Sequence, residues 1–125
     1  GHRGLVGHSL GGLFTANVLF HSPELFDHYG INSPSFVDWN QNDILLIEKK
    51  FASTHKNLPV KVFLSYGQLE DEEGIQNMKN IEKLFKSHYP DMEVKLVLFD
   101  DEGHASVIPA MISRSMRYLY ERKIK

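Results

Sequence analysis

Gly7-His8-Ser9-Leu10-Gly11-Gly12 is a Gly-x-Ser-x-Gly motif that directly follows a short apolar run and directly precedes a segment with helical spacing. A serine on a sharp strand-to-helix turn has a strained backbone and an exposed hydroxyl, and the flanking glycines remove Cβ atoms that would collide with the strand and the helix. We therefore predict that Ser9 is a nucleophile. The backbone N–H of Leu10, at the start of the helix, is predicted to bind an oxyanion, aided by the helix dipole.

The motif also arises by chance in loops, so the rest of the chain decides whether it is catalytic. Apolar runs predict four strands, over residues 3–7, 28–32, 60–66 and 94–99. Helical spacing predicts helices over residues 11–21, 40–54, 72–87 and 107–123. Strands that alternate with helices pair in parallel through right-handed crossovers. The predicted fold class is therefore α/β, with a parallel sheet of about four strands and helices on both faces.

Apolar stripes predict the buried face of each helix. In the third helix the stripe consists of Ile75, Met78, Ile81 and Phe85. In the last helix the residues expected to face inward are Ile108, Met111, Ile112, Ser115, Met116 and Leu119.

Two loops at the carboxyl ends of predicted strands carry residues that could complete a catalytic site. Glu70 follows the third strand, and we predict that its carboxylate orients a histidine, with Asp71 as the alternative. His104 follows the fourth strand, and of the seven histidines it is the only one in such a loop late in the chain. Glu72 and Glu73 are interpreted as the acidic first turn of the next helix.

The chain order of Ser9, Glu70 and His104 matches the order in which a nucleophile elbow is followed by its acid and its base. In this arrangement His104 removes the Ser9 proton during attack on an acyl carbon, and the acid holds the imidazole tautomer. The histidines show no paired metal-ligand spacing, so neither a metal nor another cofactor is predicted.

Together these residues resemble the α/β-hydrolase superfamily, and within it the esterase group that includes siderophore esterases of the enterobactin type, S-formylglutathione hydrolase and feruloyl esterases. The resemblance is carried by Gly7-His8-Ser9-Leu10-Gly11-Gly12, Ser33-Pro34-Ser35-Phe36 with Trp39, Tyr66-Gly67-Gln68-Leu69-Glu70, and Glu102-Gly103-His104. The second of these segments is most similar to the siderophore-esterase branch, where such a stretch lines the substrate cleft.

The resemblance implies a substrate cleft lined by His8, Ser35, Phe36 and Trp39. Core or strand-end packing is the alternative for the two aromatic residues, Phe36 and Trp39. The resemblance also leaves the acid open, because some siderophore esterases act with a Ser-His pair alone.

The resemblance spans residues 1–125 but only the C-terminal half of the family's domain, with the four strands matching the fifth to the eighth. We therefore expect the chain to be the C-terminal part of one larger domain that lacks the N-terminal strands and their second oxyanion N–H, whose loss typically costs about 10²–10³ in rate. The strand at residues 3–7 would then be an apolar edge. Such an edge predicts self-association or pairing with the missing N-terminal half.

The composition excludes other classes of protein. The chain is 42% hydrophobic and 24% charged, which is ordinary for one globular domain. A net charge of −2 without a Lys/Arg block predicts no nucleic-acid partner. No stretch approaches the ~20 apolar residues of a membrane span. The absence of cysteine excludes disulfides and a thiol nucleophile, and it fits the cytoplasm and the periplasm equally.

The leading interpretation is a serine esterase that acts on a small-molecule carboxylic ester, of siderophore type, through an acyl-enzyme on Ser9 with His104 as the general base. One alternative is acyl transfer to a sugar or alcohol on the same fold. Another is a catalytically inert fragment or scaffold domain. The sequence leaves the ester itself, and the choice between hydrolysis and transfer, open.

Overall fold

The computed structural model describes residues 2–121, in which strands and helices alternate along the chain. The strands are β1 (Gly4–His8), β2 (His28–Asn32), β3 (Lys61–Gly67) and β4 (Glu93–Phe99). The helices are α1 (Leu10–His21), α2 (Ile44–Ala52), α3 (Glu72–His88) and α4 (Ile108–Tyr120). The predicted α/β class is confirmed, and element bounds differ by a few residues. Residues 122 and 123, where the last helix was predicted to end, lie outside the described residues.

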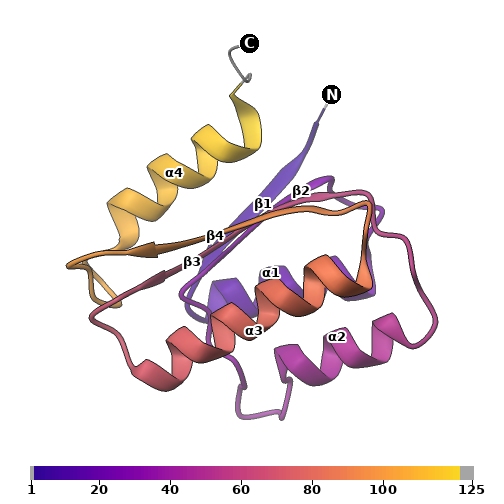
Figure 1. Ribbon diagram of the computed structural model, residues 1–125, viewed down its shortest axis with the longest axis horizontal. Coiled ribbons are helices and arrows are strands. Elements are labelled where there is room, and N and C mark those ends of the chain that lie inside the picture. The colour runs from indigo at the N-terminus through magenta and orange to yellow at the C-terminus, as the bar shows by residue number, and fades with distance from the viewer. Residues whose placement is uncertain (1, 122–125) are drawn as a thin grey trace.

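The four strands form one parallel sheet in the order β1-β2-β3-β4 (Figure 1). Strand order in the sheet is therefore the same as strand order in the chain, and each helical crossover joins two neighbouring strands. Because all strands run the same way, the loops that follow β1, β2, β3 and β4 leave the sheet at one edge. The residues predicted for the catalytic site lie in these loops, except Leu10, which is the first residue of the helix that follows β1.

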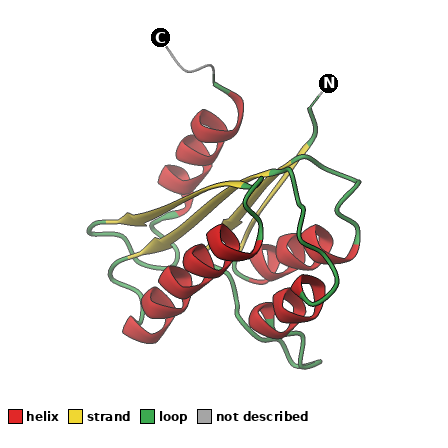
Figure 2. Cartoon of the chain, turned by 45° about the vertical axis from the view of Figure 1, so that its right-hand side comes forward, coloured by secondary structure: helices red, strands yellow, loops and turns green. Residues whose placement is uncertain are grey.

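Helices cover both faces of the sheet: α1, α2 and α3 lie on one face and α4 on the other (Figures 1 and 2). Strand β3 shows how the sequence produces the two layers. Val62 and Leu64 belong to the larger apolar cluster, under α1 to α3, whereas Phe63 between them packs in a smaller cluster with Met111 and Leu119 of α4. Successive side chains of a strand point to opposite faces, so a continuous apolar run supplies two cores.

The predicted inward face of the last helix is correct for some residues and wrong for others. Met111, Ser115 and Leu119 are buried, but Ile112 is 49% and Met116 is 47% exposed. One helix lying on a sheet buries only the stripe that faces the sheet. Within residues 2–121 no second helix packs beside α4 on this face, so its apolar flank remains open to solvent (Figure 2).

The glycines of the Gly-x-Ser-x-Gly motif are not equivalent. A Cβ on Gly7 would overlap with the carbonyl oxygen of Gly11 and lie 2.7 Å from Oγ1 of Thr15, so Gly7 permits the close approach of β1 and α1. A Cβ on Gly11 would meet nothing within 4 Å, whereas one on Gly12 would lie 3.0 Å from Cα of Pro34. The sequence-based explanation therefore holds for Gly7 and is wrong for Gly11, because the side chain of residue 11 would point to open space.

We expect Gly7→Ala to destabilise the fold by about 1–3 kcal/mol, as overpacking does. Gly11→Ala should raise stability by up to about 1 kcal/mol, because alanine replaces glycine in a helix where there is space for its methyl group. Urea unfolding of the two variants beside the unmodified protein measures both effects. Equal losses in the two variants would contradict the assigned contacts.

Candidate active site

Ser9 lies on the turn between β1 and α1 with a positive φ of 62°, a conformation that side chains rarely adopt. The turn is held from two sides. The N–H of Ser9 donates to the carbonyl oxygen of Asn32 at 3.2 Å, and its own carbonyl oxygen accepts from the N–H groups of Gly12 at 3.0 Å and Ser35 at 2.9 Å. Since Asn32 ends β2 and Ser35 follows it, the neighbouring strand stabilises the strained backbone of the nucleophile candidate.

Leu10 is the first residue of α1. Its N–H therefore has no carbonyl one turn earlier in the helix to bond, and it lies at the positive end of the helix dipole. A developing negative charge next to Ser9 would find this donor available. The geometry fits the predicted role of Leu10 in binding an oxyanion.

His104 connects Ser9 to an acid. Its Nε2 lies 3.0 Å from Oγ of Ser9, and its Nδ1 lies 2.6 Å from Oε1 of Glu70. An ionised carboxylate only accepts hydrogen bonds, so Nδ1 carries the proton and Nε2 is left to accept the hydroxyl proton of Ser9. The structure therefore brings the three predicted residues together, and the bond to Glu70 favours the tautomer that a general base requires.

The carboxylate of Glu70 is buried, with only 5% of the side chain exposed. Its second oxygen, Oε2, accepts from the hydroxyl of Ser33 at 2.6 Å and from the N–H of Gly67 at 2.7 Å. Donors of this kind stabilise the charged form of a carboxylate. Glu70 thus has the partners that a buried anion needs, and it keeps one oxygen for His104.

Asp71, the alternative acid, has other partners. It is the N-cap of α3, where its carboxylate accepts from the N–H of Gly74 at 2.9 Å, and it also accepts from the hydroxyl of Tyr66 at 2.7 Å. The hydrogen bond from Tyr66, followed by that from Gly74, lowers the pKa of Asp71. Burial, followed by the bond to Asp71, raises the pKa of Tyr66. By geometry Glu70, not Asp71, is the hydrogen-bond partner of His104.

Backbone contacts join the loop that carries Glu70 to the loop that carries His104. The N–H of Gln68 donates to the carbonyl oxygen of Phe99 at 2.9 Å, and that of Leu69 donates to the carbonyl oxygen of Glu102 at 3.0 Å. A Cβ on Gly67 would overlap with the same Glu102 oxygen, so the two loops approach closely only because residue 67 is glycine. The separation of the acid and the base is thus determined by main-chain contacts.

Two supporting residues were missed by sequence reasoning. Ser33, with a positive φ of 39°, places its hydroxyl on Glu70. Asn32 is fully buried; its side chain donates to the carbonyl oxygen of Gly7 at 3.3 Å and accepts from the hydroxyls of Ser65 and Ser115. The signal in the sequence was the pair Asn32-Ser33, two polar residues at the end of a strand. Polar groups buried at such a position require hydrogen-bond partners.

The residues predicted to line a cleft do not all lie together. An open hollow of about 470 Å³ is lined by Pro34, Ser35, Phe36, Tyr66, Leu69, Glu70, Asp71 and His104. Trp39 is 77% exposed and borders a separate hollow of about 360 Å³, on the side of Leu10. Ser9 itself lines neither hollow, but each hollow is lined by a neighbour of Ser9: His104, its hydrogen-bond partner, lines the first, and Leu10, the next residue in the chain, lines the second. His8 lines neither hollow; its Nε2–H donates to the carbonyl oxygen of His104 at 2.7 Å, so it holds the loop of the base.

Comparison with known proteins finds siderophore esterases among the relatives of the chain. The chain is 34% identical to the ferri-bacillibactin esterase BesA of Bacillus subtilis, in an alignment that covers 91% of this chain and 41% of that protein. The chain is a homologue of the siderophore esterases. It is also 30% identical to the siderophore enterobactin esterase of Emericella nidulans, over 95% of this chain and 47% of that protein. The resemblance proposed from the sequence is thereby confirmed, although no family model matches the chain.

Solved structures agree with this homology. The BES protein from Bacillus cereus superposes with a TM-score of 0.79 at 30% identity, over 95% of this chain and 46% of that one. The siderophore hydrolase EstB from Aspergillus nidulans gives a TM-score of 0.78 at 25% identity, over 98% of this chain and 50% of that one. The chain therefore has a partial α/β-hydrolase fold, and it spans about half the length of the proteins it matches.

The two candidate acids can be separated by the reactivity of Ser9 toward a fluorophosphonate probe, read by intact mass. We expect Glu70→Gln to slow labelling by about 10²–10⁴-fold, because the imidazole loses the partner that selects its tautomer. Asp71→Asn should slow labelling far less and should keep most of the helix cap, because asparagine caps a helix N-terminus about as well as aspartate. The reverse pattern would make Asp71 the acid, and normal labelling of both variants would indicate a Ser-His pair.

Proposed function

We propose that the protein containing this chain is a serine hydrolase that cleaves carboxylic esters of the siderophore type through an acyl-enzyme on Ser9. The observation that supports this most directly is the series of hydrogen bonds from Ser9 through His104 to the buried carboxylate of Glu70. The homologues are named as esterases of ferri-bacillibactin and enterobactin, which suggests the substrate class.

In the proposed reaction, Oγ of Ser9 attacks the acyl carbon while Nε2 of His104 takes the hydroxyl proton. The oxyanion of the tetrahedral intermediate receives a hydrogen bond from the N–H of Leu10. His104 then gives its proton to the leaving alcohol, and water attacks the acyl-enzyme with His104 again as the base. Glu70 stays ionised throughout and stabilises the imidazolium that forms in both halves of the reaction.

The two hollows, one lined by His104 and the other by Leu10, suggest how an ester would lie. The hollow lined by Phe36, Tyr66 and His104 adjoins the base, which must reach the leaving alcohol. The hollow between Leu10 and Trp39 adjoins the oxyanion donor, which must reach the acyl carbonyl. We therefore assign the alcohol part of the ester to the first hollow and the acyl part to the second. Aromatic side chains in both suit a ligand with ring groups.

We further propose that residues 1–125 are the C-terminal part of one α/β-hydrolase domain, in keeping with the 41% and 47% of the homologues that the chain spans. Two surfaces support this proposal. Strand β1 is an edge of the sheet, with half-buried residues along its length, and the apolar flank of α4 with Ile112 and Met116 is exposed on one face. Both are surfaces that a preceding part of the domain, or a second copy of the chain, would cover.

For the proposed activity, we expect the full-length protein to hydrolyse p-nitrophenyl acetate and butyrate, and Ser9→Ala to lower kcat/KM at least roughly 10³-fold. Ser22→Ala, which changes a serine beyond the end of α1, is the matched control and should retain full activity. Fluorophosphonate labelling of Ser9, measured in parallel, shows whether the serine is reactive even when the p-nitrophenyl esters are poor substrates. Absence of both turnover and labelling would favour an inert scaffold.

The open edge can be examined by light scattering during size-exclusion chromatography. We expect the isolated chain of residues 1–125 to self-associate, and Leu5→Lys on β1 to reduce the association, because a lysine on an edge strand disfavours strand pairing. Leu46→Lys, at an exposed site on α2, is the control and should leave the association unchanged. A strictly monomeric isolated chain would argue against the proposed pairing.

A further inference from the structure

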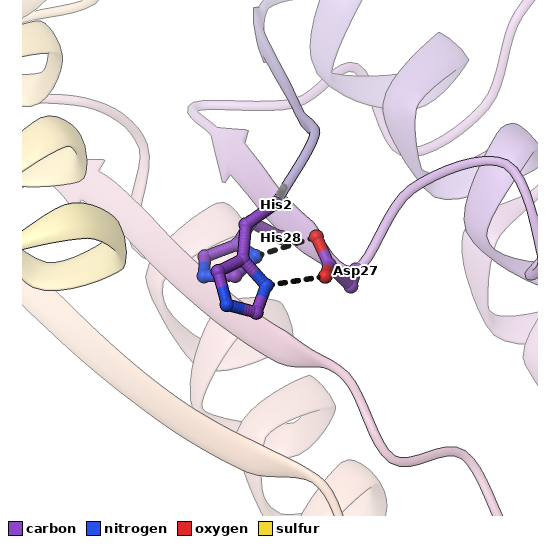
Figure 3. Close-up of side chains that lie close together, drawn as sticks. All are labelled: His2, Asp27 and His28. Carbon is purple, nitrogen blue, oxygen red and sulfur yellow. Dashed lines mark hydrogen bonds and ion pairs between the residues drawn. The ribbon is translucent and has the colours of Figure 1, made fainter.

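Three polar side chains meet at the opposite end of the sheet from Ser9 (Figure 3). His2 lies two residues before the start of β1, Asp27 directly precedes β2, and His28 is the first residue of β2. The Nδ1–H of His2 donates to Oδ2 of Asp27 at 2.7 Å, and the Nδ1–H of His28 donates to Oδ1 at 2.8 Å. The two imidazoles therefore converge on one carboxylate, one from the segment before β1 and the other from the start of β2.

The backbone holds these residues in place. The carbonyl oxygen of Arg3 accepts from the N–H groups of Asp27 at 3.0 Å and His28 at 3.3 Å, and the N–H of Arg3 returns a bond to the Asp27 carboxylate at 3.0 Å. The ring of His28 is 12% exposed and lies parallel to the ring of Tyr120 in α4, with 5.0 Å between centroids. The carboxylate and one imidazole are thus positioned in advance, and the exposed ring of His2 completes the group.

The donor set has the composition of a metal site. Each residue offers one ligand atom, and the three atoms lie within 4.8 Å of one another, the only such group in residues 2–121. Two imidazole nitrogens and one carboxylate oxygen suit divalent ions of borderline softness, Zn²⁺ above all. A metal binds such a set as an ionised carboxylate and neutral imidazoles.

We propose that His2, Asp27 and His28 bind one Zn²⁺ ion, which fastens the start of edge strand β1 to the start of β2. On binding, each neutral imidazole moves its Nδ1 proton to Nε2 and gives the freed lone pair to the metal. The metal bonds of about 2.0 Å replace the two hydrogen bonds, and water completes the coordination. The site is structural, because it lies at the amino ends of the strands and Ser9 lies at their carboxyl ends.

Sequence reasoning predicted no metal because it looked for ligands paired along one element. Here His2 and His28 are brought together by the parallel register that pairs Gly4 with His28. Neighbouring parallel strands begin at the same edge of a sheet, so residues distant in the chain share one corner.

The test uses the full-length protein after removal of metal by a chelator. Co²⁺ is titrated first, with visible absorption reporting its coordination, and Zn²⁺ is then titrated in competition with a chromophoric chelator. We expect one ion per chain and a higher Tm with Zn²⁺. His2→Ala, which removes an exposed ligand without disturbing the core, and Asp27→Asn should each weaken Zn²⁺ binding at least roughly tenfold.

His21→Ala, which removes an exposed histidine at the end of α1, is the matched control and should bind Zn²⁺ as the unmodified protein does. Equal affinity in the unmodified protein, His2→Ala and Asp27→Asn would overturn the proposal. Absence of saturable Zn²⁺ binding, or the same loss in His21→Ala, would overturn it as well. Fluorophosphonate labelling of Ser9 should not change in His2→Ala, so the outcome is independent of the proposed hydrolase activity.

Discussion

One buried carboxylate connects the ends of three strands. Glu70 follows β3 and accepts from Ser33 after β2, from Gly67 at the end of β3 and from His104 after β4. If the sheet were out of register by one residue, these donors would point to the other face, and a buried anion would be left without partners at a cost of several kcal/mol. The geometry around Ser9 therefore depends on the pairing of strands that are far apart in the chain.

The sequence was most informative where chemically active residues stand next to a clear strand or helix pattern. The glycine-serine motif, the apolar runs and the order of Ser9, Glu70 and His104 were sufficient to predict the class, the eight elements and the group of residues that the structure brings together. The catalytic roles of those residues remain predictions. Periodicity also identified the buried stripe of α3, because a helix on a sheet buries one face whatever lies around it.

The structural features that could not be predicted from the sequence depend on contacts between elements. Glu48 lies at a buried position of α2, where the hydrogen bonds from His88, at the end of α3, and from Tyr89, directly after it, make an acid tolerable. In the sequence Asn32 likewise reads as an ordinary strand end. Its burial is explained only by the hydrogen bonds that it accepts from Ser65 and Ser115. Ile112 is the opposite case, an apolar residue that was predicted to be buried but is exposed. An apolar stripe indicates that a helix face should be covered, but it does not indicate what covers it.

The order of the strands has a consequence for how the chain folds. Since the spatial order β1-β2-β3-β4 repeats the chain order, each new strand can add to the growing edge through one local crossover, and no earlier strand has to be displaced. Ser9 and His104, by contrast, are 95 positions apart. During synthesis the serine emerges first and the histidine last, so secondary structure accumulates well before the two meet. Reactivity of Ser9 is thus a marker of the finished sheet, whereas circular dichroism would report its early steps.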